Sequence, residues 1–165
     1  MILPVLQYPD PRLSLVAEAV GDITPELREL AANMVETMYA RDGIGLAAPQ
    51  VGAALRLVVI DVSGPEKRED LRILVNPRIT LLGGELDSEE GCLSVLDYSA
   101  CVTRRERALV EATDLEGRPL SFEADGRLAI CVQHECDHLE GLLFIDRISR
   151  LKRGMLDRKL LKKAR

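Results

Sequence analysis

Five β-rich runs occupy the middle of the sequence, and no helical pattern separates them. They cover residues 55–62, 71–75, 78–82, 108–113 and 120–124. Turn signals such as Asn76-Pro77 and Gly83-Gly84 divide the runs. Parallel strands need long crossovers, usually helices, so strands that follow one another through turns are expected to pair antiparallel. The sequence therefore predicts an α+β fold with antiparallel sheet rather than a doubly wound fold.

Two helical patterns flank these runs. Residues 24–26 combine an N-cap threonine, a first-turn proline and an acid near the positive end of the helix dipole. Apolar side chains then recur at helical spacing at Leu27, Leu30, Met34 and Met38. This helix should end near residues 42–43. Residues 43–52 are so rich in glycine and small side chains that we expect an irregular loop there.

The second helical pattern begins near Asp125 and ends before Gly141, which suits a C-cap. A last helix, amphipathic and basic, is expected at residues 149–163. The predicted architecture is thus antiparallel β-sheet packed around a central helix, with one helix near the N-terminus and one at the C-terminus.

The chain has 165 residues, 47% of them hydrophobic, which is enough for one sizeable core. We expect a single domain over residues 1–165. The N-terminus does not combine a basic stretch with a long apolar run, and no window is apolar enough for a membrane span. A cytoplasmic protein is therefore expected, with no membrane or DNA partner and with its four cysteines reduced.

Both histidines of the chain lie in QHECDH (133–138), inside the second helical pattern. On a helix each residue advances about 100°, so His134 and His138 stand one turn apart on one face and can hold one metal ion. In hydrolases with this H-E-x-x-H pattern, the glutamate takes a proton from water that the metal has acidified. Glu135 is therefore a candidate general base. A third protein ligand is needed, and Cys, Asp and Glu are the candidates.

Helix geometry argues against the two cysteines beside the histidines. Cys136 lies about 200° around the helix from His134, on the opposite side. Cys131 shares the histidine face but lies roughly 7 Å along the axis from a metal between the histidines, so it is expected in the pocket wall or core. Cys101 lies in an apolar stretch and is expected to be buried. Cys92, expected at a strand start, remains a candidate that position alone does not establish.

Each feature taken alone has an ordinary structural explanation. A single H-E-x-x-H match is about as often structural or accidental as functional. Free cysteines such as Cys92 are among the most buried residues. Residues 43–45 alone are typical of a turn, and Gln50 alone is typical of a solvated loop amide. Only the combination is specific.

The combination resembles the peptide deformylase family. Its three signature motifs have counterparts, in the same order and at similar separations, in GIGLAAPQ (43–50), EGCLS (90–94) and QHECDH (133–138). The resemblance covers nearly the whole chain and extends to VLQYPDPRL (5–13), ETMYARDG (36–43), VIDVS (59–63), NP (76–77) and EADGRLAIC (123–131). It implies a metal-dependent hydrolase that removes the formyl group from the N-terminal formylmethionine of new polypeptides and releases formate.

The resemblance also implies roles for the matching residues. Cys92, His134 and His138 would bind one divalent metal, typically Fe²⁺ in cells and replaceable by Ni²⁺, Co²⁺ or Zn²⁺. Glu135 would be the general base and would later protonate the leaving amine.

The oxyanion formed from the formyl group would be stabilised by the metal, the side-chain amide of Gln50 and the backbone N–H of Leu93. The residues that border the substrate would be Ile44, Gly45, Ile130 and Cys131, with Gly45 offering a backbone contact.

Three positions depart from the usual pattern of this family. Leu96 follows CLSV where members often have proline, and Arg127 and Ser88 replace residues that are often apolar near the methionine pocket. Arg127 either extends outward or changes the shape of the pocket. These departures bear on substrate preference more than on the chemistry.

Two other classes of protein compete with this hypothesis. A zincin-like metallopeptidase would share the two histidines and Glu135, but such proteins usually recruit a third histidine or a glutamate as ligand. A deformylase-like protein kept only for binding would be expected to have lost Glu135, Gln50 or Cys92, and all three are present.

The C-terminal segment, residues 147–165, carries nine Lys or Arg against one acid, in a chain whose net charge is −5. Family members act on nascent chains, so this segment could meet ribosomal RNA phosphates in a salt-sensitive contact. A solvated helix face is the equally ordinary alternative.

Overall fold

A computed structural model describes residues 1–163, so the last two residues of the basic segment lie outside the described part. The helices are α1 (Pro25–Ala40), α2 (Gly64–Lys67), α3 (Gly126–Leu139) and α4 (Arg150–Lys163). The strands are β1 (Gly45–Ala47), β2 (Leu57–Ile60), β3 (Arg72–Cys92), β4 (Val95–Thr113) and β5 (Pro119–Asp125). Short 3-10 helices are η1 (Pro11–Ser14), η2 (Ala48–Val51) and η3 (Phe144–Arg147).

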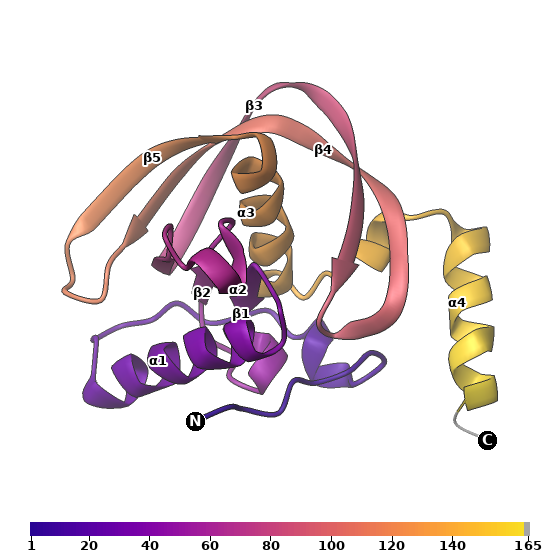
Figure 1. The fold of residues 1–165 in the computed structure, drawn as a ribbon, viewed down its shortest axis with the longest axis horizontal. Helices are drawn as coiled ribbons and strands as arrows, with labels where there is room; N and C mark the ends of the chain where they lie inside the picture. The colour runs from indigo at the N-terminus through magenta and orange to yellow at the C-terminus, as the bar shows by residue number, and fades with distance from the viewer. Residues whose placement is uncertain (164–165) are drawn as a thin grey trace.

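The strands form one sheet in sequence order, β1-β2-β3-β4-β5, and every neighbouring pair is antiparallel. The predicted α+β class is therefore confirmed. Figure 1 shows β3 and β4 as long, strongly curved ribbons that arch over α3, while α1 lies below the short strands. The curvature lets one sheet cover the central helix from several sides.

The prediction of separate strands at 71–75 and 78–82, divided by a turn, is wrong. The register of β3 against β4 shifts between Val75 and Arg78, where Asn76 has a positive φ of 51°, and the strand continues. A second shift lies between Leu82 and Glu85, at the two glycines. Such bulges add residues to one strand and bend it without ending it. The two turn signals therefore mark bends in one continuous strand.

Residues 43–52 are more regular than expected. β1 pairs with β2, with Leu46 opposite Val59, and η2 follows directly. Both Leu46 and Ala47 are fully buried. Because buried backbone N–H and C=O groups need hydrogen-bond partners, this segment pairs as a strand despite its glycines.

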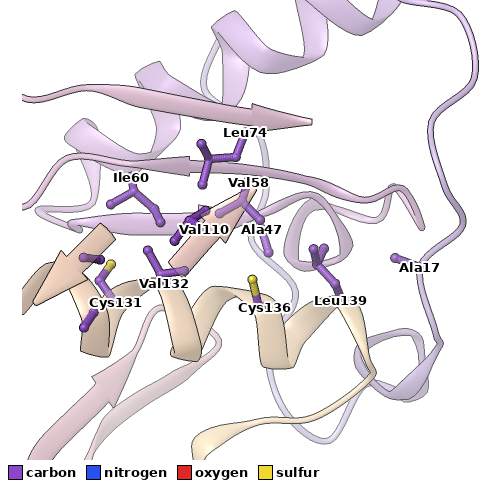
Figure 2. Packing of buried hydrophobic residues seen from close by; sticks show 12 residues of the cluster. Ala17, Ala47, Val58, Ile60, Leu74, Val110, Cys131, Val132, Cys136 and Leu139 are labelled. Atoms are coloured by element: carbon purple, nitrogen blue, oxygen red, sulfur yellow. The ribbon is translucent and has the colours of Figure 1, made fainter. Parts of the chain in front are cut away.

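The core between α3 and the sheet is built from small and branched side chains. Figure 2 shows side chains of α3 directed at those of β1, β2 and β4, and the labelled contacts include Cys131, Val132, Cys136, Leu139, Ala47, Val58, Ile60 and Val110. This packing fixes the side of α3 that faces the sheet. His134 and His138 project from another part of the helix surface, toward Cys92 at the end of β3.

The N-terminal helix follows its predicted pattern. Thr24 caps α1 by accepting a hydrogen bond from the backbone N–H of Leu27 at 3.2 Å. Leu27, Met34 and Met38 are buried, and Leu30 is partly buried against the same cluster. The helix begins at Pro25 and ends at Ala40, close to the predicted bounds.

The C-terminal helix α4 forms as predicted but is not cleanly amphipathic. Leu156 is buried, whereas Leu151, Met155 and Leu161 are exposed. The helix is attached by polar contacts as well, since the hydroxyl of Tyr8 donates to Asp157 at 2.6 Å. It lies at one side of the molecule in Figure 1. Within residues 1–163, no helix has the length and apolar character needed to cross a bilayer.

Candidate active site

Cys92, His134 and His138 come together although they are far apart in sequence. One ligand atom of each lies within 4.8 Å of the others, and Cys92 Sγ is 3.5 Å from His138 Nε2. Both histidines project from α3, one turn apart. Cys92 is the last residue of β3, so the prediction that it begins a strand is wrong. The end of the strand brings the thiol to the helix face.

His134 is oriented by a buried carboxylate. Its Nδ1 lies 3.0 Å from Glu90 Oε1, which leaves Nε2 for a ligand. Arg104 donates to both oxygens of Glu90, at 2.8 and 2.7 Å, and to Asp137 at 2.7 Å. Burial alone would raise the pKa of Glu90, but the hydrogen bonds from Arg104 and His134 outweigh it and lower the pKa to about 2. Glu90 is therefore a fixed negative charge behind His134.

Glu135 has the opposite environment. It is 4% exposed, and its Oε1 has no hydrogen-bond partner among residues 1–163. Burial raises the pKa of Glu135 to about 7, despite the nearby His134 and Arg104. Its Oε1 is 4.0 Å from His138 Nε2. A carboxyl group with a free oxygen and a pKa near neutrality is suited to accept and release a proton.

Position 45, beside this carboxyl group, has room only for a glycine. A Cβ on Gly45 would come within 2.5 Å of Glu135 Oε2 and 3.0 Å of Cys131 Sγ. Any side chain there would displace Glu135. Because Gly45 has no side chain, its backbone in β1 is open to the cavity.

Gln50 is buried with its side chain aimed at the thiol. Its Oε1 accepts from the backbone N–H of Ala47 at 2.9 Å, which fixes the direction of the amide. Its Nε2 then donates to Ser94 Oγ at 3.1 Å and to Cys92 Sγ at 3.5 Å. Gln50 Nε2 therefore points toward Cys92, and its role toward a substrate oxygen stays a prediction.

These groups border one cavity of about 840 Å³. It is lined by most of the predicted site residues and by the three departures: Ile44, Gly45, Gln50, Ser88, Cys92, Leu93, Leu96, Arg127, Ile130, Cys131, His134 and Glu135. His138 lies behind them and is 1% exposed. The cavity is large enough for several residues of a peptide.

Of the other three cysteines, Cys131 and Cys136 lie where the sequence predicted, and Cys101 does not. Cys131 is buried, lines the cavity and belongs to the core, as helix geometry predicted. Cys136 is buried on the sheet side of α3. Cys101 was expected to be buried, and that is wrong because its side chain points outward from β4 between the buried Ala100 and Val102.

The donor set fits a divalent transition metal. One thiol and two imidazoles are the ligand types that bind zinc or iron, and three protein ligands leave a position open for catalysis. The unpartnered oxygen of Glu135 beside them is consistent with a further group in this space.

The family model described as polypeptide deformylase matches residues 2–154. A peptide deformylase from Thermodesulfovibrio yellowstonii is 48% identical over 158 residues, which are 96% of this chain and 96% of the relative. The crystal structure of a peptide deformylase from Legionella pneumophila matches with a TM-score of 0.93 at 43% identity, over 99% of this chain and 96% of that one. The chain belongs to the peptide deformylase family.

Membership establishes the general activity of the chain. Peptide deformylases are metal-dependent hydrolases that act on the formyl group of nascent peptides, so the chain is an enzyme of this class. The predicted resemblance to the peptide deformylase family is confirmed.

Several residues make supporting contacts around the site that the sequence analysis did not predict. The fold brings Glu90, Arg104 and Gln7 to the site from distant parts of the sequence. Gln7 Nε2, for example, donates to the carbonyl of Leu93 at 2.7 Å, across 86 positions of sequence. Gln133, beside the first histidine, similarly holds the backbone of Arg105 with two hydrogen bonds, at 3.0 and 2.8 Å.

Proposed function

We propose that this deformylase hydrolyses the formyl group of formylmethionyl peptides with Glu135 as its proton-transfer group. The observation that carries the proposal is the buried carboxyl group of Glu135, which has one oxygen without a partner and lies beside the cluster of Cys92, His134 and His138. We expect the activity in the cytoplasm, because its proposed substrates are nascent chains.

Cys92, His134 and His138 would hold one divalent ion. When bound, the ion supplies Lewis acidity, which acidifies water and polarises the formyl oxygen. Fe²⁺ is the expected ion in cells, and Ni²⁺, Co²⁺ or Zn²⁺ would occupy the same ligands. A thiolate ligand is soft and oxidisable, so we expect the iron form to lose activity in air.

Glu135 moves the proton in this proposal. Its Oε1 accepts the proton of the attacking water and later delivers it to the nitrogen that leaves as the new N-terminal amine. A pKa near neutrality suits both directions of transfer. Burial of the carboxyl group is the cause of the raised pKa.

Gln50 and Leu93 would stabilise the oxygen that becomes negative. The amide of Gln50 is held by Ala47 with its Nε2 directed to the thiol of Cys92, and Leu93 follows that thiol in the chain. Donors fixed before the reaction need no reorganisation when charge develops. Their positions beside the cluster support this role.

The peptide would lie along β1, with the methionine side chain in the apolar part of the cavity. Ile44, Ile130 and Cys131 line that part, and Gly45 would offer its backbone to the peptide. Arg127 is exposed at the cavity border, where it would meet residues that follow methionine.

Formate release is the direct test of this proposal. Protein loaded with Ni²⁺, which avoids oxidation of iron, should release formate from a formyl-Met-Ala-Ser peptide and leave the same peptide with a free amine. Retention of the formyl group on the peptide at one bound metal ion per chain would refute the proposal. An acetyl-Met-Ala-Ser peptide serves as the control substrate.

We also propose that the basic face of α4 contacts ribosomal RNA. Lys152, Arg158, Lys159 and Lys162 are exposed, and nascent formylated chains emerge from the ribosome.

A further inference from the structure

The N-terminal segment before η1 runs along the site and holds it at three points. The backbone N–H of Leu6 donates to the carbonyl of Gln50 at 2.7 Å, and that of Tyr8 donates to the carbonyl of Ser94 at 2.8 Å. Between them, the side-chain amide of Gln7 donates to the carbonyl of Leu93 at 2.7 Å. Two of the three bonds are made by the backbone and survive a change of side chain. The bond to Leu93 depends on Gln7 alone.

Leu93 and Ser94 form a connection that needs outside support. They join Cys92 and Val95, which pair across the end of β3 and β4. Two-residue hairpin turns that match the twist of their strands require a positive φ, and neither Leu93 nor Ser94 has one. The register also shifts between Gly91 and Cys92. The orientation of this turn is therefore not determined by local backbone preference.

The peptide group between Leu93 and Ser94 is held at both of its ends. Its carbonyl oxygen accepts from Gln7 Nε2, and its N–H donates to Cys92 Sγ at 3.4 Å. Hydrogen bonds on the two ends of one peptide polarise each other, so the donor to the thiol is strengthened by the bond to Gln7. The same contact fixes the backbone of Leu93 on the side toward the cavity.

We propose that Gln7 is a positioning residue of the deformylase site. Through the Leu93–Ser94 peptide, it holds one N–H on the sulfur of Cys92 and keeps the N–H of Leu93 directed at the substrate oxygen. The proposal rests on the function proposed above for Cys92 and Leu93. Gln7 does not touch the reacting atoms, so its effect is on their orientation.

The test compares Gln7→Met, which keeps the length of the side chain without its donor, with Gln7→Lys, which restores a donor. Gln7→Met should lower kcat about tenfold, as expected for loss of one aligned donor, with KM changed less than about twofold. In Co²⁺-loaded protein, its thiolate-to-cobalt absorption band should shift to longer wavelength, because the sulfur loses a hydrogen bond. Gln7→Lys should recover part of both changes.

A matched control loosens the same segment at another point. Thr37 Oγ1 accepts from the backbone N–H of Leu3 at 2.8 Å, and Thr37→Val removes that contact far from the turn. This variant should lower the melting temperature but leave kcat and the cobalt band unchanged. If it lowers kcat as much as Gln7→Met does, looseness of the N-terminus is the cause and the positioning role is overturned.

Failure of this inference differs from failure of the proposed function. A Gln7→Met protein with wild-type kcat and an unshifted cobalt band would overturn the role of Gln7, while formate release by the wild type would still stand. If the wild type released no formate, the function would fail, and a band that Gln7→Met leaves unshifted would overturn the inference as well.

Discussion

Two buried glutamates near His134 show how the partners of a carboxyl group determine its pKa. Glu90 accepts two hydrogen bonds from Arg104, and its pKa falls to about 2. Glu135 is buried without such a partner, and its pKa rises to about 7. The first is suited to hold a cationic or ligating histidine, the second to exchange a proton near neutral pH. Glu90 is therefore suited to a structural role and Glu135 to a chemical one.

Tyr39 is the residue for which pH should change stability most simply. Its hydroxyl donates to Asp61 at 2.5 Å, and burial together with this bond raises the pKa of Tyr39 to about 12, from 10.0. Because the folded-state pKa is the higher one, the stabilisation is complete below pH 10 and is lost as pH rises toward 12.

Tyr39→Phe should therefore remove part of the alkaline loss of stability. We expect its free energy of unfolding to be about 1 kcal/mol lower at pH 8, since one hydrogen bond is lost. Between pH 10 and about 12 it should decline less steeply than the wild type. Urea unfolding at a series of pH values measures both. Parallel curves for the two proteins over that range would contradict this account of Tyr39.

At the scale of elements, the sequence predicted the features that depend on local pattern. α1 and α3 repeat apolar side chains at helical spacing, and their bounds lie close to the expected ones. The pattern of β3 was misjudged because Asn76-Pro77 is a turn signal in isolation. In the fold, the side chain of Asn76 bonds Val20 at 2.8 and 2.9 Å, which stabilises a bulge instead. A contact with Val20, which is distant in sequence, therefore favours a bend in the strand over the turn that Asn76-Pro77 predicts.

The same reasoning explains which parts of the site were predictable. Cys92, His134, Glu135 and Gln50 belong to short motifs whose residue types have a chemical meaning. The roles of Glu90 and Arg104 depend on β3, β4 and α3 meeting at one place, which no spacing in the sequence expresses. Motifs reveal reacting groups, whereas the side chains that orient them become visible only in the fold.

Arg104 joins three elements, so its loss should affect both stability and metal binding. Arg104→Ala would leave Glu90 buried without its main partner, which should lower the free energy of unfolding by about 3–5 kcal/mol. The misplaced Glu90 should weaken metal binding roughly 10–100-fold. Urea unfolding and competition with a chromophoric Zn²⁺ chelator measure the two effects.

Arg107→Ala provides the matched control on the same strand. Arg107 pairs with Glu123 at 2.7 Å in an exposed position, so its loss should cost less than about 1 kcal/mol and leave metal affinity unchanged. Equal effects of the two substitutions would show that the buried network has no special role.

At the scale of the whole molecule, charge is distributed unevenly. The basic helix α4 lies at one side of the body, and its attachment through Leu156 and Asp157 leaves other faces free in the described chain. Exposed cations and the exposed apolar Leu151 and Met155 are separate from the residues that anchor the helix. Binding and anchoring can therefore be tested independently.

Replacing Lys152, Arg158, Lys159 and Lys162 with glutamine should weaken co-sedimentation with ribosomes without unfolding α4. The loss should be largest at low salt, because phosphate contacts release counterions. Formate release from a free peptide should be unchanged, which serves as the control. Undiminished co-sedimentation would contradict a role of this face in binding ribosomal RNA.

The central claim is that a metal held by Cys92, His134 and His138 acts together with the proton-transfer group Glu135. The most direct measurement is formate release and metal content in Glu135→Ala beside the wild type, both loaded with Ni²⁺. We predict one ion per chain in both proteins and formate only from the wild type. Formate release by Glu135→Ala at a rate close to that of the wild type would contradict the claim.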